Sequence, residues 1–110
     1  VDIRKGSPTI GQWYGRIVSD RDFVQIWAPA NFARGVCVLS DYAEIQYKVT
    51  GSYNNKAESG ILWNDPEIGI QWPVENPILS DKDTNAQTLQ QWLERPEADF
   101  FKYDASQDFK

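Results

Sequence analysis

Apolar and polar side chains alternate along the first part of the chain with the two-residue period of β-strands. Over residues 12–19 both alternating sets carry apolar side chains, which predicts a strand with two occupied faces. Turn-forming residues at 19–22 separate it from a second predicted strand over residues 23–28. That strand ends at Pro29, because proline has no N–H to donate to a neighbouring strand.

The same type of pattern continues through the middle of the chain. The continuous apolar run at 35–39 predicts a buried strand, and strict alternation over 44–50 places Tyr47 on an apolar face that is expected to point inward. Two shorter strands are predicted over 61–63 and 68–72. Strands at roughly ten-residue spacing with turns between them predict an all-β antiparallel sandwich or barrel, and a jelly roll is one such architecture.

The pattern changes after Ser80, where a short helix is predicted. Thr84 and Asn85 are expected to cap it, and its apolar residues recur at helical spacing before Pro96: Leu89, Trp92 and Leu93. We therefore predict a β-sandwich domain over residues 1–83, followed by a helix and tail over residues 84–110 that pack on the domain or on a partner.

The tail after Pro96 has aromatic residues among charged ones and no clear period: Phe100, Phe101, Tyr103 and Phe109. These aromatic side chains either dock on a neighbouring subunit or belong to a frayed terminus, which is the commoner outcome.

Composition narrows the range of partners. The net charge is −5, and the lysines and arginines are scattered, so nucleic acid and membrane surfaces are not expected partners. No apolar run approaches the roughly 20 residues that span a bilayer. No charged-then-apolar leader precedes the first strand, so we expect a soluble cytoplasmic protein. The single cysteine, Cys37, lies in the apolar run at 35–39 and is predicted to be a core residue.

The chain contains no histidine. With one cysteine and no tight group of carboxylates, it cannot build the usual metal site of a cupin, so no metal or other cofactor is expected. A Ser-His-Asp or Cys-His arrangement is excluded for the same reason. No glycine-rich phosphate loop precedes a predicted helix.

Several motifs occur in an order that resembles the dTDP-4-dehydrorhamnose 3,5-epimerase family, the RmlC-like cupins. The motifs are Val1-Asp2-Ile3-Arg4-Lys5-Gly6-Ser7-Pro8-Thr9, Gly11-Gln12-Trp13, Trp27-Ala28-Pro29, Phe32-Ala33-Arg34-Gly35, Ala43-Glu44, Tyr47-Lys48, Ile61-Leu62-Trp63-Asn64-Asp65-Pro66, Gly69-Ile70, Trp72-Pro73 and Leu79-Ser80-Asp81-Lys82-Asp83. The resemblance covers the C-terminal two-thirds of the family's pattern. It implies a metal-free jelly roll, dimeric through exchanged or shared strands, which acts on a nucleotide-linked 4-keto-6-deoxy sugar (a dTDP-sugar).

The resemblance also implies site residues. The family inverts a centre beside the sugar ketone, which requires a base, a group that stabilises the enolate, and an acid on the opposite face. Tyr47 matches the proton donor, and Asp83 matches the carboxylate that orients the catalytic histidine. Glu58 and Lys82 match positions that contact the nucleotide portion. From the residues alone, a strand tyrosine such as Tyr47 is usually a core or rim residue, Asp83 is a carboxylate at the start of a helix, and Glu58 and Lys82 are usually solvated surface charges.

The chain departs from the family at the base. The family's Arg-Gly-Leu-His motif and its enolate-stabilising lysine precede the first residue of this chain, and Arg34 stands where relatives have histidine. An arginine stays protonated, so Arg34 can hold a phosphate or ketone oxygen but cannot accept a proton. We therefore expect no epimerase activity from this chain alone, since losing a general base costs about a hundred- to ten-thousandfold in rate.

Two interpretations remain open for the whole chain. It is either a truncated piece of a longer epimerase homologue or a self-sufficient noncatalytic binding or oligomeric interaction module. In both cases a jelly roll without its first strands leaves apolar residues uncovered: Trp13, Phe23, Trp27 and Val36. Uncovered strand edges favour exchange between chains, so a homodimer or larger oligomer is predicted.

Overall fold

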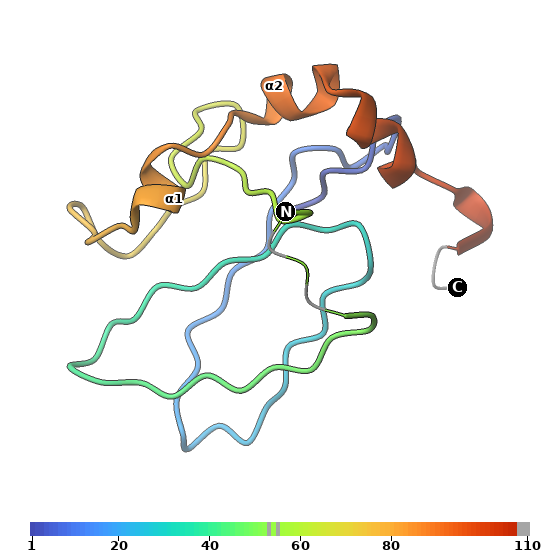
Figure 1. Ribbon diagram of the computed structural model, residues 1–110. Helices are drawn as coiled ribbons and strands as arrows, with labels where there is room; N and C mark the ends of the chain where they lie inside the picture. The colour runs from blue at the N-terminus through green and yellow to red at the C-terminus, as the bar shows by residue number, and fades with distance from the viewer. Residues whose placement is uncertain (53, 55, 108–110) are drawn as a thin grey trace.

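The computed structural model describes residues 1–52, 54 and 56–107, which form a packed part and an open part (Figure 1). In the packed part, the C-terminal helices lie over the N-terminal segment and the loops that follow residue 58. In the open part, the backbone from about residue 13 to about residue 50 runs in long, widely separated stretches.

The helical elements all lie in the last third of the described chain. There are two short α-helices, α1 (Asp81–Thr84) and α2 (Leu89–Glu94), and two 3₁₀ helices, η1 (Pro96–Phe101) and η2 (Ala105–Gln107). The predicted C-terminal helix is therefore present as α2, and it ends before Pro96 as the sequence indicates.

The predicted start of this helix is wrong. Thr88, rather than Thr84 or Asn85, is the N-cap of α2: its hydroxyl accepts from the Gln91 N–H at 3.1 Å, and the Gln91 side chain accepts from the Thr88 N–H at 2.9 Å. This reciprocal capping box satisfies two of the N–H groups at the start of the helix. Thr84 instead ends the separate turn α1, whose N-cap is Ser80.

The core is small and lies between the two ends of the chain. Within the described part of the chain it consists of five buried apolar residues: Ile3, Ile68, Leu89, Trp92 and Ala98. Trp92 is 4% exposed, and its ring meets that of Phe101 edge to face, with 5.1 Å between ring centroids. Because Leu89 and Trp92 share one face of α2, the helical spacing predicted from the sequence is confirmed.

The C-terminal segment docks on the N-terminal segment of the same chain. The backbone N–H of Lys5 donates to the Phe101 carbonyl at 3.2 Å, and the Lys5 carbonyl accepts from the Tyr103 N–H at 3.0 Å. The Trp92 indole N–H donates to the Ile3 carbonyl at 3.2 Å. Phe101 and Tyr103 of the predicted tail therefore have partners within the same chain, whereas Phe100 is exposed and Phe109 lies outside the described residues.

The apolar run at 35–39 was predicted to be buried, but in this single chain it is largely exposed. Val36 is 65% exposed and Val38 50% exposed. Cys37 is half-buried and is not part of the core. The physical reason is the lack of cover: among the described residues, no backbone hydrogen bond joins this run to another segment.

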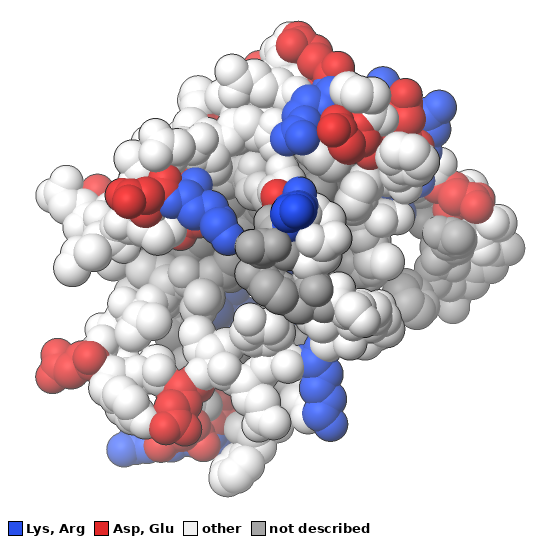
Figure 2. Space-filling view, in the orientation of Figure 1, with Lys and Arg blue, Asp and Glu red and all other residues white. Residues whose placement is uncertain are grey.

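The β-sandwich remains a prediction. Within residues 1–52, 54 and 56–107 the pairing between extended segments is limited to three isolated bridges, Asp2 with Phe32, Lys5 with Lys102 and Ile61 with Gln87. Figure 2 shows large uncharged areas over the open part, with basic side chains scattered among acidic ones. Apolar side chains that a sandwich would enclose lie at the surface in this structure, among them Phe23, Trp27 and Val36.

Candidate functional site

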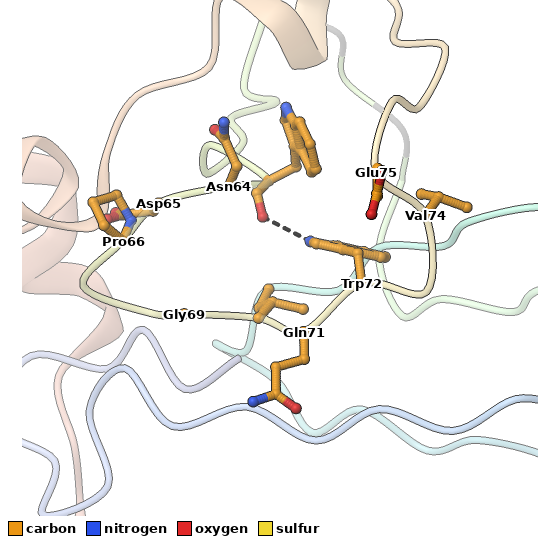
Figure 3. A pocket seen from close by; sticks show the side chains of 10 residues that line it. Asn64, Asp65, Pro66, Gly69, Gln71, Trp72, Val74 and Glu75 are labelled. Carbon is orange, nitrogen blue, oxygen red and sulfur yellow. Dashed lines mark hydrogen bonds between the residues drawn. The ribbon is translucent and has the colours of Figure 1, made fainter.

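A depression in the surface lies along the segment from residue 63 to residue 75 (Figure 3). Its volume is about 270 Å³. The indoles of Trp63 and Trp72, both half-buried, contribute to its lining, and the Trp72 indole N–H donates to the Trp63 carbonyl at 2.7 Å. This hydrogen bond fixes the orientation of the Trp72 ring.

Asp65 connects the depression to the core. Its side chain is buried, and its two carboxylate oxygens accept from the backbone N–H of Leu89 at 2.7 Å and of Glu67 at 2.9 Å. The bond to Leu89 satisfies an N–H group in the first turn of α2, which has no partner within the helix. The sequence named Asp65 only as part of the family motif that ends at Pro66 and gave no sign of its bond to the helix.

The structure brings two of the predicted site residues together in a first pair. The Arg34 guanidinium carbon lies 5.4 Å from the centroid of the Tyr47 ring, within the range of a cation–π contact. Tyr47 is 71% exposed, so the prediction that its face of the 44–50 segment points inward is wrong for this chain. The reason is again that nothing in the described part of the chain covers this segment.

Glu58 and Lys82 form a second pair. The Lys82 Nζ lies 2.5 Å from a Glu58 carboxylate oxygen, and both side chains are exposed to solvent. Asp83 follows directly within α1, and its backbone N–H donates to the Ser80 hydroxyl at 3.2 Å. The sequence suggested that Asp83 lies at the start of the C-terminal helix. In the structure it belongs instead to the separate helical turn α1.

None of these five residues lines the depression of residues 63–75. The nearest connection runs through Gly35, where a β-carbon would stand 3.8 Å from the Trp72 ring. Arg34, the neighbour of Gly35, is therefore close in sequence to a residue beside the depression. Four of the five predicted site residues form two pairs, Arg34 with Tyr47 and Glu58 with Lys82, and Asp83 belongs to neither. The depression is a further feature that the sequence did not single out.

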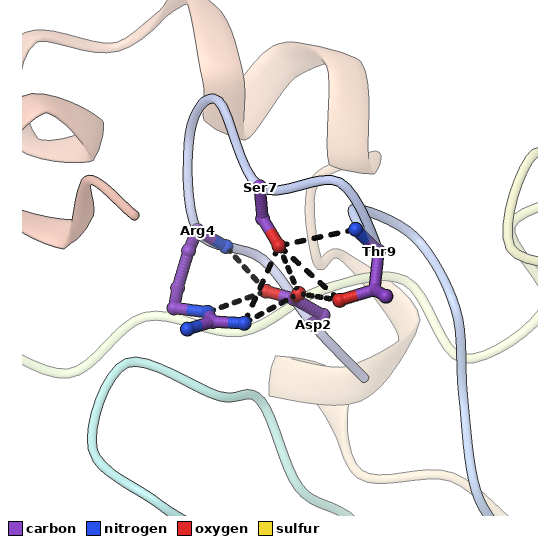
Figure 4. Close-up of polar contacts among 4 residues, drawn as sticks. All are labelled: Asp2, Arg4, Ser7 and Thr9. Atoms are coloured by element: carbon purple, nitrogen blue, oxygen red, sulfur yellow. Dashed lines mark hydrogen bonds and ion pairs between the residues drawn. The ribbon is translucent and has the colours of Figure 1, made fainter. Parts of the chain in front are cut away.

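A buried polar cluster surrounds Asp2 (Figure 4). Its carboxylate is 2% exposed and accepts from Arg4 at 3.0 Å and from the hydroxyls of Ser7 and Thr9 at 2.6 Å each. The Arg4 guanidinium also lies over the rings of Phe32, at 4.6 Å, and Tyr103, at 4.9 Å. Because the Ser7 hydroxyl donates to a carboxylate and no imidazole is near it, this cluster is built for stability rather than nucleophilic catalysis.

The described residues also bear on metal binding and on membrane crossing. No group of three or more His, Cys, Asp or Glu side chains there lies close enough to hold a metal ion. In the same residues, no helix combines the length and the apolar character needed to cross a membrane.

Comparison with known proteins identifies the family. The family described as dTDP-4-dehydrorhamnose 3,5-epimerase matches residues 1–91. The dTDP-4-dehydrorhamnose 3,5-epimerase of Shigella flexneri is 55% identical over 87 residues, which are 79% of this chain and 48% of that protein. The enzyme of the same name from Neisseria gonorrhoeae is 49% identical over 92 residues, 83% of this chain and 28% of that protein.

A relative named as a 3-epimerase also matches most of this chain. The dTDP-4-dehydrorhamnose 3-epimerase of Streptomyces niveus is 37% identical over 89 residues, 81% of this chain and 43% of that protein. The chain spans about half the length, or less, of the curated relatives it matches. Since the match to the family extends over 91 of the 110 residues, this chain belongs to the dTDP-4-dehydrorhamnose 3,5-epimerase family.

Proposed function

We propose that this chain is a domain of deoxysugar metabolism that binds a nucleotide-linked deoxysugar, such as a dTDP-sugar, and does not epimerise it by itself. The observation that carries the proposal is the continuous match to the epimerase family over residues 1–91, in a chain that contains no histidine. The family has the RmlC-like cupin fold, a β fold, and we propose that residues 1–83 adopt that jelly roll when the open part is covered.

Two cationic side chains support binding of the nucleotide portion. Arg34 presents a guanidinium, which can hold two phosphate oxygens at once, beside the exposed ring of Tyr47. Lys82 presents an ammonium whose ion pair with Glu58 lies at the surface. A surface pair of this kind contributes at most about 1 kcal/mol, so Lys82 can turn to a phosphate group at little cost. In our proposal, Glu58 also contacts the nucleotide portion.

The chemistry of the same groups explains why we propose no turnover. Proton abstraction beside a ketone requires a group that is unprotonated near neutral pH. Arg34 stays protonated, and the chain has no imidazole. In our proposal, Tyr47 keeps the position of the proton donor and Asp83 that of the carboxylate which, in relatives, orients a histidine.

Thermal unfolding with and without millimolar dTDP tests the binding proposal. A ligand present at about a hundred times its dissociation constant adds roughly 2.7 kcal/mol to the free energy of unfolding, so the unfolding temperature is expected to rise. Arg34→Ala and Lys82→Ala are expected to abolish the rise. Arg21→Ala removes an exposed cation outside the matched site positions and is expected to keep it.

A well-folded protein that shows no shift would contradict the binding proposal. The claim of no turnover has its own readout: the chain is incubated in heavy water with a nucleotide-linked 4-keto-6-deoxy sugar, and deuterium in the sugar is followed by mass spectrometry. No incorporation is expected, and incorporation above that of the protein-free control would overturn it.

A second candidate function is that of a noncatalytic oligomeric interaction module. The observation that favours it is the exposure of apolar side chains along the open part of the chain, including Phe23 at 96% and Trp27 at 76%. Apolar surfaces of this extent are characteristic of protein–protein contacts. We propose that a second copy covers this surface through exchanged strands.

Light scattering during size-exclusion chromatography tests the oligomeric proposal. A dimer or larger species is expected at micromolar concentration, because the core of five residues in one chain buries little apolar surface. A stable, folded monomer over the whole accessible concentration range would contradict it. An oligomer that does not bind dTDP would favour the interaction module over the sugar-binding domain.

A further inference from the structure

The depression of residues 63–75 has the chemistry of a site for a cation. Two indole side chains, Trp63 and Trp72, contribute to its lining. The face of an indole carries negative charge density, and tryptophan is the aromatic residue that attracts cations most strongly. The hydrogen bond from Trp72 to the Trp63 carbonyl orients one of these rings before any ligand arrives.

The charges of the lining have one sign. Asp65 and Glu75 both contribute, and none of the described lysines or arginines does. Figure 3 shows Glu75 beside the Trp72 indole, with Asn64 on the other side of the depression. The Asp65 carboxylate is already used by two backbone N–H groups, whereas no hydrogen bond or ion pair of the exposed Glu75 side chain occurs within the part of the chain that the structure describes.

These features distinguish between classes of ligand. A phosphate or nucleotide would meet two carboxylates and no basic side chain, so anions are repelled. A neutral sugar could use the indoles and the Asn64 amide, but it would gain nothing from the negative charge. A quaternary or methylated ammonium gains from both the indole rings of the lining and the Glu75 charge. The volume of about 270 Å³ is just below the range of about 300–1,000 Å³ for drug-sized ligands, so it suits a small head group.

We propose that the depression bounded by Trp63, Trp72 and Glu75 binds a small organic cation of the alkylammonium class. This site is separate from the residues proposed to bind the nucleotide, Arg34 and Lys82, and takes a ligand of opposite charge. If no organic cation binds in the depression, the proposed binding of a nucleotide-linked sugar is not affected. If no nucleotide binds, the proposed cation site is likewise not affected.

Titration with choline chloride tests the site, with the indole N–H signals of the five tryptophans followed by NMR at constant ionic strength. Saturable shifts of the Trp63 and Trp72 signals are expected in the millimolar range. Glu75→Gln is expected to raise the dissociation constant about two- to fivefold, because it removes the charge and preserves the shape. Glu94→Gln changes an exposed carboxylate of α2 outside the depression and is expected to leave it unchanged.

Three probes decide the ligand class. The neutral isostere of choline, 3,3-dimethylbutan-1-ol, is expected to bind more weakly than choline; equal binding would overturn the assignment of a cation and indicate a merely apolar depression. Glucose and inorganic pyrophosphate are expected to cause no shift, and binding of either in place of choline would also overturn it. The absence of any choline-dependent shift up to tens of millimolar would refute the site itself.

Discussion

Replacing Trp92 with alanine is expected to destabilise the protein by about 3–5 kcal/mol, the cost of emptying a buried aromatic site. Trp92 is 4% exposed, contacts Phe101 edge to face and donates to the Ile3 carbonyl. It therefore joins α2 to both the N-terminal segment and η1. Urea unfolding followed by far-ultraviolet circular dichroism measures the loss.

The matched control for this substitution is Phe100→Ala. Phe100 lies next to Phe101 in η1 but is 84% exposed, so its removal is expected to change stability by less than about 0.5 kcal/mol. If Trp92→Ala costs under about 1 kcal/mol, or if the two variants are equally unstable, the buried Trp92 does not organise the core.

Replacing Asp2 with asparagine is expected to cost about 3–5 kcal/mol at neutral pH, because it removes one partner of a largely buried ion pair. Side-chain exposure is 2% for Asp2 and 16% for Arg4, so the Arg4 guanidinium would keep its desolvation without its counter-charge. Asp99→Asn removes a carboxylate from the exposed pair with Lys5 and is the matched control, for which a much smaller effect is expected.

The Asp2 contribution is also expected to depend on pH. Burial acts to raise the pKa of the Asp2 carboxyl, but hydrogen bonds from Arg4, Ser7 and Thr9 outweigh it and hold this pKa well below its ordinary value. A carboxyl with a lowered folded-state pKa stabilises the fold fully above its unfolded pKa of about 3.9, and loses that contribution as the pH falls below it.

The free energy of unfolding of the wild-type protein is thus expected to stay level between about pH 5 and pH 7 and to fall below about pH 4. The Asp2→Asn variant is expected to start lower and to fall less steeply, and urea unfolding at several pH values measures both curves. Parallel curves would show that Asp2 does not carry the acid sensitivity.

The local sequence was enough to predict the buried face and the C-terminal end of the helix α2. The spacing of Leu89, Trp92 and Leu93 predicted an amphipathic helix that ends before Pro96, and α2 has that face and that end. Its start was misplaced at Thr84 and Asn85, because several residues there are good caps. The structure shows that Thr88 is the N-cap, because it forms reciprocal hydrogen bonds with Gln91.

Contacts between residues far apart in the sequence could not be predicted from local patterns. The bond from Leu89 to Asp65 spans 24 positions, and that from Trp92 to Ile3 spans 89. A local pattern shows which side chains share a face, but it does not show which distant segment meets them. The depression between Trp63 and Trp72 was missed for the same reason, although both residues lie in motifs that carry the family resemblance.

The sequence by itself determined the family, the helix before Pro96 and the lack of a histidine base, because each follows from residue identity and order. The tertiary structure alone decided which apolar residues are buried. Val36 lies in a continuous apolar run and Trp92 has polar neighbours in the sequence, yet Val36 is 65% exposed and Trp92 only 4%. Burial depends on whether another segment is present to cover a side chain, and that is a property of the assembled chain rather than of any local pattern.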